Sequence, residues 1–275
     1  MTNPARVAPP EKPAAGALLR RVLVPAEHGG WAFLAEPMLL GLLVACSGAG
    51  VALAIAALAA YLARQPLRLL VMDRRRGRRY ARSILAEQVF AGCALAGALA
   101  LAAAGLLAHR PFLLPLALAA PLVALSLALD LGARTREAAA EVAGAVALGA
   151  LAPAIALADE WSLGPALGLW AVLAARALPT VLFVRARLRR DRGESAGIAG
   201  PLVAHAFALL AVALLAKRGL APWSAVGAVG LLALRCAFGL SPIRPRMSTP
   251  RLGITELVFG LITVFATAWG IARGH

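Results

Sequence analysis

The chain has 275 residues, of which 61% are hydrophobic and only 15% are charged, and its mean hydropathy is +0.80. A water-soluble protein of this length would not need so much apolar surface, so the composition excludes an ordinary soluble domain. The net charge of +15 could suggest a nucleic-acid partner. We expect none, because the basic residues stand in short segments between apolar runs, where anionic membrane lipids are the nearer partner.

Nine apolar runs follow one another along the chain, most of them near the length that crosses a hydrocarbon core of ~30 Å. Only helices can satisfy the backbone groups of such runs within lipid. We therefore predict an all-α fold, a polytopic membrane bundle of about nine transmembrane helices. The runs cover residues 29–46, 48–63, 84–108, 111–130, 138–158, 162–184, 196–216, 219–239 and 253–272.

The arginines are sorted between the gaps that separate these runs. Arg6, Arg20 and Arg21 precede the first run, and the gaps after runs two and six hold most of the others. Because Lys and Arg in short loops mark the cytoplasmic side, we predict a bacterial inner-membrane protein with a cytoplasmic N-terminus. Residues 1–22 are expected to form a disordered basic tail. Residues 23–275 then form one transmembrane domain, with possible halves 23–135 and 136–250 and a final helix over 251–272.

The ionisable residues that we place inside the runs fall on the cytoplasmic half, except His205, which is expected near the midplane. A charge in hydrocarbon costs about 2.5–3.5 kcal/mol, so such side chains are expected to face one another or a wet cavity. The alternative is that each carboxylate reaches the interface or pairs with Arg176 or Arg235 for structural reasons. The residues that we expect to line a cytoplasm-facing cavity are Glu27, His28, Glu36, Glu87 and Glu256.

The arginines themselves are candidates for anion binding. Arg75 and Arg78 are three residues apart, as are Arg187 and Arg190, and this spacing places each pair on one face of a helix. Planar guanidinium groups suit phosphate or diphosphate oxygens, although the same arginines also serve as ordinary topology anchors. The complete set of predicted anion-binding residues is Arg64, Arg68, Arg75, Arg78, Arg176, Arg187 and Arg190.

Two segments carry a resemblance to a known family. They are VPAEHGGWAFLAEPMLLGLL (24–43) and RQPLRLLVMDRRRGRRYARS (64–83), and they resemble the YwiC-like family of bacterial membrane proteins. The Glu-His-Gly-Gly-Trp entry is the most specific part. This resemblance implies a membrane protein and no particular biochemical activity.

The architecture is also faintly similar to that of the UbiA-type intramembrane prenyltransferases. In those enzymes, aspartates in the loops after helices two and six hold magnesium and the diphosphate of an isoprenoid. The resemblance makes Asp73 and Asp191 candidate metal ligands, and adds Glu27 and Glu36 as candidate catalytic residues. One carboxylate per loop is few for such a site, so Mg²⁺ is expected only if this chemistry holds, and otherwise no cofactor.

The leading functional hypothesis is a pocket, polar and lined by arginines, that binds or transfers an isoprenoid phosphate or diphosphate or another anionic lipid. The alternatives are a small-solute transporter or channel, with His205 as its midplane residue, and a non-catalytic membrane assembly factor. The sequence leaves open whether the protein is an enzyme.

Overall fold

The computed structural model describes residues 19, 22–23, 28–132 and 137–274, and in these ranges it holds helices and no strands. The predicted tail over 1–22 lies almost wholly outside the described residues, as do Glu27 and the side chain of His28. The helices are α2 (His28–Val44), α3 (Gly48–Arg75), α4 (Ala81–Leu107), α5 (Leu113–Leu131), α6 (Ala138–Gly149), α7 (Leu151–Ala158), α8 (Leu163–Asp191), α9 (Ala199–Lys217), α10 (Trp223–Leu240) and α11 (Thr249–Ala272).

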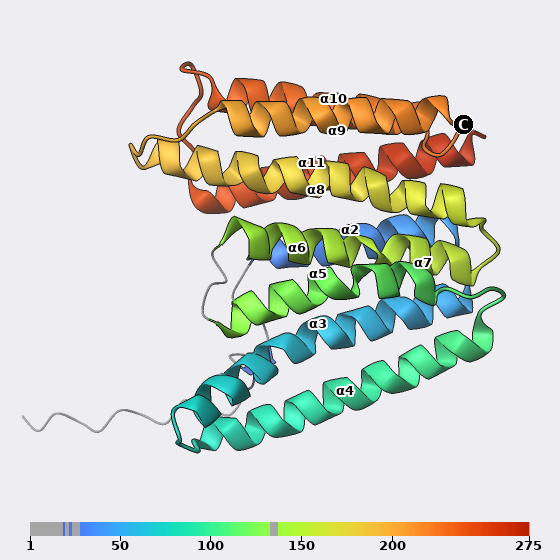
Figure 1. Ribbon diagram of the computed structural model, residues 1–275, viewed down its shortest axis with the longest axis vertical. Helices are drawn as coiled ribbons and strands as arrows, with labels where there is room; N and C mark the ends of the chain where they lie inside the picture. The colour runs from blue at the N-terminus through green and yellow to red at the C-terminus, as the bar shows by residue number, and fades with distance from the viewer. Residues whose placement is uncertain (1–18, 20–21, 24–27, 133–136, 275) are drawn as a thin grey trace, which may run out of the picture.

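The helices run back and forth along one common direction (Figure 1). α4 lies at one edge, against α3, whereas α9 and α10 lie at the other edge, and α2, α6 and α7 lie between. Eight helices of the described chain are long and apolar enough to cross a membrane, with α6 and α7 counted as one span over Ala138–Ala158, and α2 is a shorter apolar helix. The predicted helical membrane bundle is therefore confirmed.

The interior is built around α7, whose eight residues are all buried. Ile155 of α7 packs where two helices come close. A Cβ atom added at Gly41 or at Gly50 would lie 2.9 Å from an Ile155 carbon. Small residues at these positions let α2 and α3 approach α7, which is how membrane helices gain packing energy without a hydrophobic driving force.

Two helices extend well beyond the runs predicted for them. α3 continues to Arg75 and α8 to Asp191, whereas the apolar runs ended at 63 and 184. Arginine is a good helix former, and cations stabilise a helix at its C-terminal end, so the basic segments prolong the helices instead of forming loops. With 28 and 29 residues, each helix is about 42–44 Å long, more than a hydrocarbon core needs.

Most basic segments gather at one end of the bundle. We call this the arginine-rich end, where α3, α5, α8 and α10 end and α4, α6, α9 and α11 begin, on the left in Figure 1. α3 and α8 finish there with Gly77 and Gly193, whose φ angles of 62° and 81° suit glycine and close the helices. The expected sorting of arginines is thus visible in the fold. The cytoplasmic orientation and the division into halves stay predictions.

We expect cysteine labelling to separate the two ends. In a protein whose three native cysteines are replaced by alanine, Arg78→Cys and Arg192→Cys should react with an impermeant maleimide from one side of the membrane. Glu160→Cys and Arg218→Cys should react from the other side. All four positions are exposed, so accessibility does not bias the comparison. Labelling of all four from the same side would contradict the bundle as described.

Candidate functional site

Asp73, a candidate metal ligand, belongs to α3 and lies at its end, beside the turn to α4. It is buried, and both of its carboxylate oxygens accept hydrogen bonds from Arg82, at 2.7 and 3.2 Å. Ser83 donates a third hydrogen bond at 2.8 Å. Three donors from the start of α4 therefore hold the carboxylate at the end of α3. This arrangement explains why the two helices form a hairpin.

A second set of ion pairs joins α3 to α5 through Asp130. Arg64 Nε donates to Asp130 Oδ2 at 2.8 Å, and Arg68 Nε lies 3.6 Å from Oδ1. Nearby, Arg75 donates to the backbone oxygen of Leu131 at 2.5 Å. Sequence reasoning missed Asp130, although a carboxylate inside an apolar run was the signal that could have found it.

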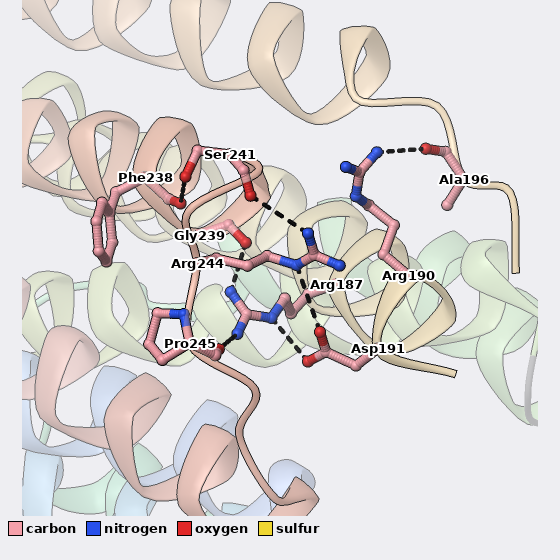
Figure 2. A network of polar contacts seen from close by, with 9 residues as sticks. All are labelled: Arg187, Arg190, Asp191, Ala196, Phe238, Gly239, Ser241, Arg244 and Pro245. Atoms are coloured by element: carbon pink, nitrogen blue, oxygen red, sulfur yellow. Dashed lines mark hydrogen bonds and ion pairs between the residues drawn. The ribbon is translucent and has the colours of Figure 1, made fainter. Parts of the chain in front are cut away.

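A third network holds the end of α8 against the α10–α11 loop (Figure 2). Arg187 is buried and donates to Asp191 Oδ2 at 2.8 Å, to Gly239 O and to Pro245 O. Arg244 lies 3.4 Å from Asp191 Oδ1 and donates to Ser241 O at 3.2 Å. Arg187 and Asp191 thus serve to position the loop.

Arg190 forms fewer hydrogen bonds than Arg187. Figure 2 shows it directed away from Arg187, toward Ala196, and that contact is long at 3.5 Å. Its Nε atom is buried without a hydrogen-bond partner. Arg190 and Arg244 line an open pocket of about 480 Å³ together with the segment from Gly193 to Gly197.

The most unusual feature lies inside the bundle, where four charged side chains from four helices meet. Glu36 of α2 and Arg176 of α8 form an ion pair of 2.7 Å, with side-chain exposures of only 3% and 2%. Arg176 also donates to the backbone oxygen of Glu256 in α11, at 2.9 Å. The Glu256 side chain pairs with Arg235 of α10. We call these four residues the buried quartet.

Aromatic rings and a glycine shape the surroundings of the quartet. The Arg235 guanidinium lies 4.3 Å from the Phe183 ring centroid and 5.2 Å from that of Phe259. Arg176 lies 5.0 Å from the Phe33 centroid. Cation–π contacts of this kind stabilise a cation that has lost its water. Gly260 leaves the room that Glu36 occupies, since an added Cβ would overlap Glu36 Oε1 and lie 2.7 Å from Arg176 Nη2.

The structure therefore brings together only part of the predicted cavity. Glu36, Arg176 and Glu256 converge, but they are buried against each other and do not line a cavity open to solvent. Glu87 lies elsewhere and forms an exposed pair of 2.7 Å with Arg79. The reason is helix geometry: α4 packs at the edge of the bundle, against α3, so its residues cannot reach α8 or α11.

The arginines that were expected to share a helix face do not point together: Arg190 is directed away from Arg187 (Figure 2). Arg187 and Arg190 both belong to α8, whereas α3 ends at Arg75 and leaves Arg78 in the following loop. The roles of all these arginines in binding an anion stay predictions.

The carboxylates that the prenyltransferase likeness offers do not fit a magnesium site. Asp73 is taken up by Arg82 and Ser83, and Asp191 is paired with Arg187 and Arg244. Mg²⁺ needs carboxylate oxygens that are free to enter its octahedral shell, and arginine-bound carboxylates do not offer them. Within the described residues, no three His, Cys, Asp or Glu side chains come together as a metal site.

The fold and its buried charges define a polytopic helical membrane protein. Residues 24–156 match the model of a family described as YwiC-like protein, which confirms the resemblance for the part of the chain from α2 into α7. No curated protein and no solved structure matches the chain. The likeness to UbiA-type prenyltransferases is therefore not confirmed. Of the buried quartet, only Glu36 lies inside the matched segment.

We expect Asp73→Ala to destabilise the protein by about 1–3 kcal/mol, because it leaves the Arg82 and Ser83 donors without their buried acceptor. Thermal unfolding in detergent would measure the change. Glu87→Ala is the matched control, because it removes a carboxylate from an exposed pair on the same hairpin and should change stability by about 0–1 kcal/mol. Equal effects of the two substitutions would contradict the assigned role of Asp73.

We expect Arg176→Met to cost about 3–5 kcal/mol, because it leaves the Glu36 carboxylate buried and unpaired. Adding Glu36→Gln should restore part of the lost stability, since the second substitution removes the uncompensated charge. A double-mutant cycle on unfolding free energies would measure the coupling. Strictly additive effects would show that the two side chains do not interact in the folded protein.

Proposed function

We propose that this protein binds the phosphate group of an anionic lipid at its arginine-rich end, and that this end faces the cytoplasm. The observation that carries the proposal is the pocket lined by Arg190 and Arg244, between the α8–α9 and α10–α11 loops. Its volume of about 480 Å³ falls in the range of roughly 300–1,000 Å³ that small-molecule sites occupy.

The state of the arginines supports an anionic ligand. Arg190 lines the pocket and makes one long hydrogen bond of 3.5 Å, so its guanidinium group retains donors that a phosphate oxygen would satisfy. Arg187 was predicted to bind an anion as well, but its donors already form hydrogen bonds to Asp191 and to two backbone oxygens of the protein. Arg244 also lines the pocket, although it lies 3.4 Å from Asp191 Oδ1 and donates to Ser241 O, so Arg190 is the less engaged of the two. The proposed ligand-binding pair is Arg190 with Arg244, and Arg187 positions the α10–α11 loop beside them.

The backbone around the pocket supports the same class of ligand. Gly197 lines the pocket and α9 begins two residues later, at Ala199. The first N–H groups of a helix have no intrahelical partner and carry a partial positive charge, which favours phosphate oxygens. Glu194 also lines the pocket, but it pairs with Arg189 at 3.3 Å, so its charge is offset.

A lipid is a better candidate than a free phosphate because exposed apolar residues adjoin the pocket-lining segments in the chain. Ile198 follows the pocket segment and is 42% exposed, and Ile243 precedes Arg244 and is 80% exposed. A ligand that has both an acyl or isoprenoid chain and a phosphate would contact both kinds of surface. We propose binding and not transfer, because Asp73 and Asp191 are already paired with arginines. Transport and an assembly role stay alternative predictions.

We expect Arg190→Gln and Arg244→Gln each to weaken binding of farnesyl diphosphate roughly tenfold or more, because a charge-assisted hydrogen bond contributes about 1.5–3 kcal/mol. Binding to the purified protein in detergent can be followed by isothermal titration calorimetry. Arg110→Gln and Arg218→Gln remove the same charge at the opposite end and should leave the affinity unchanged.

Inorganic diphosphate should bind more weakly than farnesyl diphosphate if the apolar flank takes part. Equal affinities for the two compounds would show that the site binds the phosphate groups alone and does not contact the lipid chain. Failure of the wild-type protein to bind either compound would refute the proposal.

A further inference from the structure

One residue of the pocket at the arginine-rich end is not explained by phosphate binding. Among the described residues that line this pocket, Glu194 is the one that carries a carboxylate, beside Arg190 and Arg244. A carboxylate repels phosphate oxygens, so it would weaken a site whose only task is to hold an anion. A structural explanation is that Glu194 serves its ion pair with Arg189. The details of that pair point to a second role.

The carboxylate of Glu194 is only partly engaged by the chain. Oε2 accepts a hydrogen bond of 3.3 Å from Arg189 Nε, whereas Oε1 lies 3.9 Å from Arg192 Nη1, which is too far for a hydrogen bond. The three side chains are 48%, 57% and 67% exposed, and exposed pairs of this kind contribute little. Arg189 and Arg192 do not line the pocket. Oε1 of Glu194 can therefore accept a hydrogen bond from a ligand inside it.

The α8–α9 loop holds Glu194 at the pocket. Its backbone N–H donates to Arg189 O at 3.0 Å, and Arg189 Nη2 donates to Ser195 O at 3.2 Å. Arg189 therefore fixes both the side chain of Glu194 and the backbone that follows it. Ser195 also lines the pocket, and a serine hydroxyl can both donate and accept a hydrogen bond. The pocket thus offers acceptors next to the phosphate donors of Arg190 and Arg244.

Two kinds of donor fit such an acceptor: the hydroxyl groups of a polyol and the ammonium group of an amine. Charge favours the hydroxyl groups, because the arginines in and around the pocket outnumber the carboxylates. The arginines are Arg187, Arg189, Arg190, Arg192 and Arg244, and the carboxylates are Asp191 and Glu194. A ligand ammonium would add positive charge beside Arg189 and Arg192, whereas a hydroxyl group donates a hydrogen bond without adding charge.

The size of the pocket agrees with a head group that is larger than a phosphate alone, since about 480 Å³ lies within the roughly 300–1,000 Å³ of small-molecule sites. We propose that Glu194, with Ser195, recognises hydroxyl groups next to the lipid phosphate, so that the site selects a phosphodiester of a polyol, as in phosphatidylglycerol. This inference rests on the proposed phosphate contacts of Arg190 and Arg244. It adds a selectivity that those contacts lack, because guanidinium groups bind phosphate oxygens of any ester.

Short-chain lipids separate the head-group contacts from the phosphate contacts. Dihexanoyl phosphatidylglycerol and dihexanoyl phosphatidylmethanol carry the same phosphodiester charge, but only the first has head-group hydroxyls. Dihexanoyl phosphatidylethanolamine has an ammonium group in their place. Isothermal titration calorimetry on the full-length protein in detergent measures the three affinities. Wild-type protein should bind the phosphatidylglycerol about tenfold more tightly than the phosphatidylmethanol, because hydrogen bonds to a carboxylate are stronger than neutral ones.

Glu194→Met removes both acceptor oxygens and nearly keeps the length of the side chain. It should weaken binding of the phosphatidylglycerol and bring the ratio of the two affinities to about one, because the charge-assisted bond is lost. Glu87→Met is the matched control. Glu87 is also an exposed carboxylate at the arginine-rich end, 2.7 Å from Arg79, but it belongs to α4 and does not line the pocket. This variant should keep the preference of the wild type.

The outcomes distinguish this inference from the proposed function. Equal affinities of the wild type for phosphatidylglycerol and phosphatidylmethanol would overturn the inference, as would an unchanged preference in Glu194→Met. Tighter binding of phosphatidylethanolamine than of phosphatidylglycerol would overturn the hydroxyl assignment in favour of an ammonium group. If farnesyl diphosphate binds and none of the three lipids does, this inference alone fails. If farnesyl diphosphate also fails to bind, the phosphate site fails with it.

A competition experiment on wild-type protein covers the case in which Glu194→Met does not fold. Glycerol 1-phosphate should displace farnesyl diphosphate at an about tenfold lower concentration than methyl phosphate, which has the same phosphate group and no hydroxyl. Equal potency of the two compounds would contradict a role for head-group hydroxyls.

Discussion

The arrangement of α2, α8, α10 and α11 depends on one constraint: charges inside a membrane-spanning bundle must find each other. Glu36, Arg176, Arg235 and Glu256 come from four helices and satisfy this constraint by meeting at one place. Ion pairs between buried side chains tolerate little displacement, because a charge that loses its partner remains in a medium of low dielectric constant. The quartet therefore fixes how these four helices stand relative to one another, a precision that apolar packing of alanine and leucine does not provide.

The same principle acts again, less deeply, at the arginine-rich end. Each of Asp73, Asp130 and Asp191 pairs with arginines and so joins two elements of the fold: α3 with α4, α3 with α5, and α8 with the α10–α11 loop. Most arginines there have a partner within the fold, as expected for arginines whose role is structural. Arg190 and Arg244 differ from the others because they line an open pocket. Arg190 makes only one long hydrogen bond, whereas Arg244 lines the pocket while it is also paired with Asp191.

The arginine-rich end and the buried quartet differ in their surroundings. The pocket at the arginine-rich end is open and is lined by Arg190 and Arg244, and it is the site that we propose for a lipid phosphate. The quartet is enclosed, and there unpartnered donor atoms of Arg176 and Arg235 lie in the same cluster as unpartnered acceptor atoms of Glu36 and Glu256. Arg176 and Arg187 both belong to α8, so one helix takes part in both places.

The sequence by itself determined the class of fold, because hydrophobic length and the alternation of arginine-rich gaps are local properties of the chain. It also identified Glu36, Arg176 and Glu256 as side chains that need partners, since their cost in lipid can be read without coordinates. Only the tertiary structure decided which partners they find. Glu87 met the same sequence criterion but belongs to a hairpin at the edge of the bundle, and Asp130 went unnoticed. Helix packing sets these distances, and it depends on contacts between residues far apart in the chain.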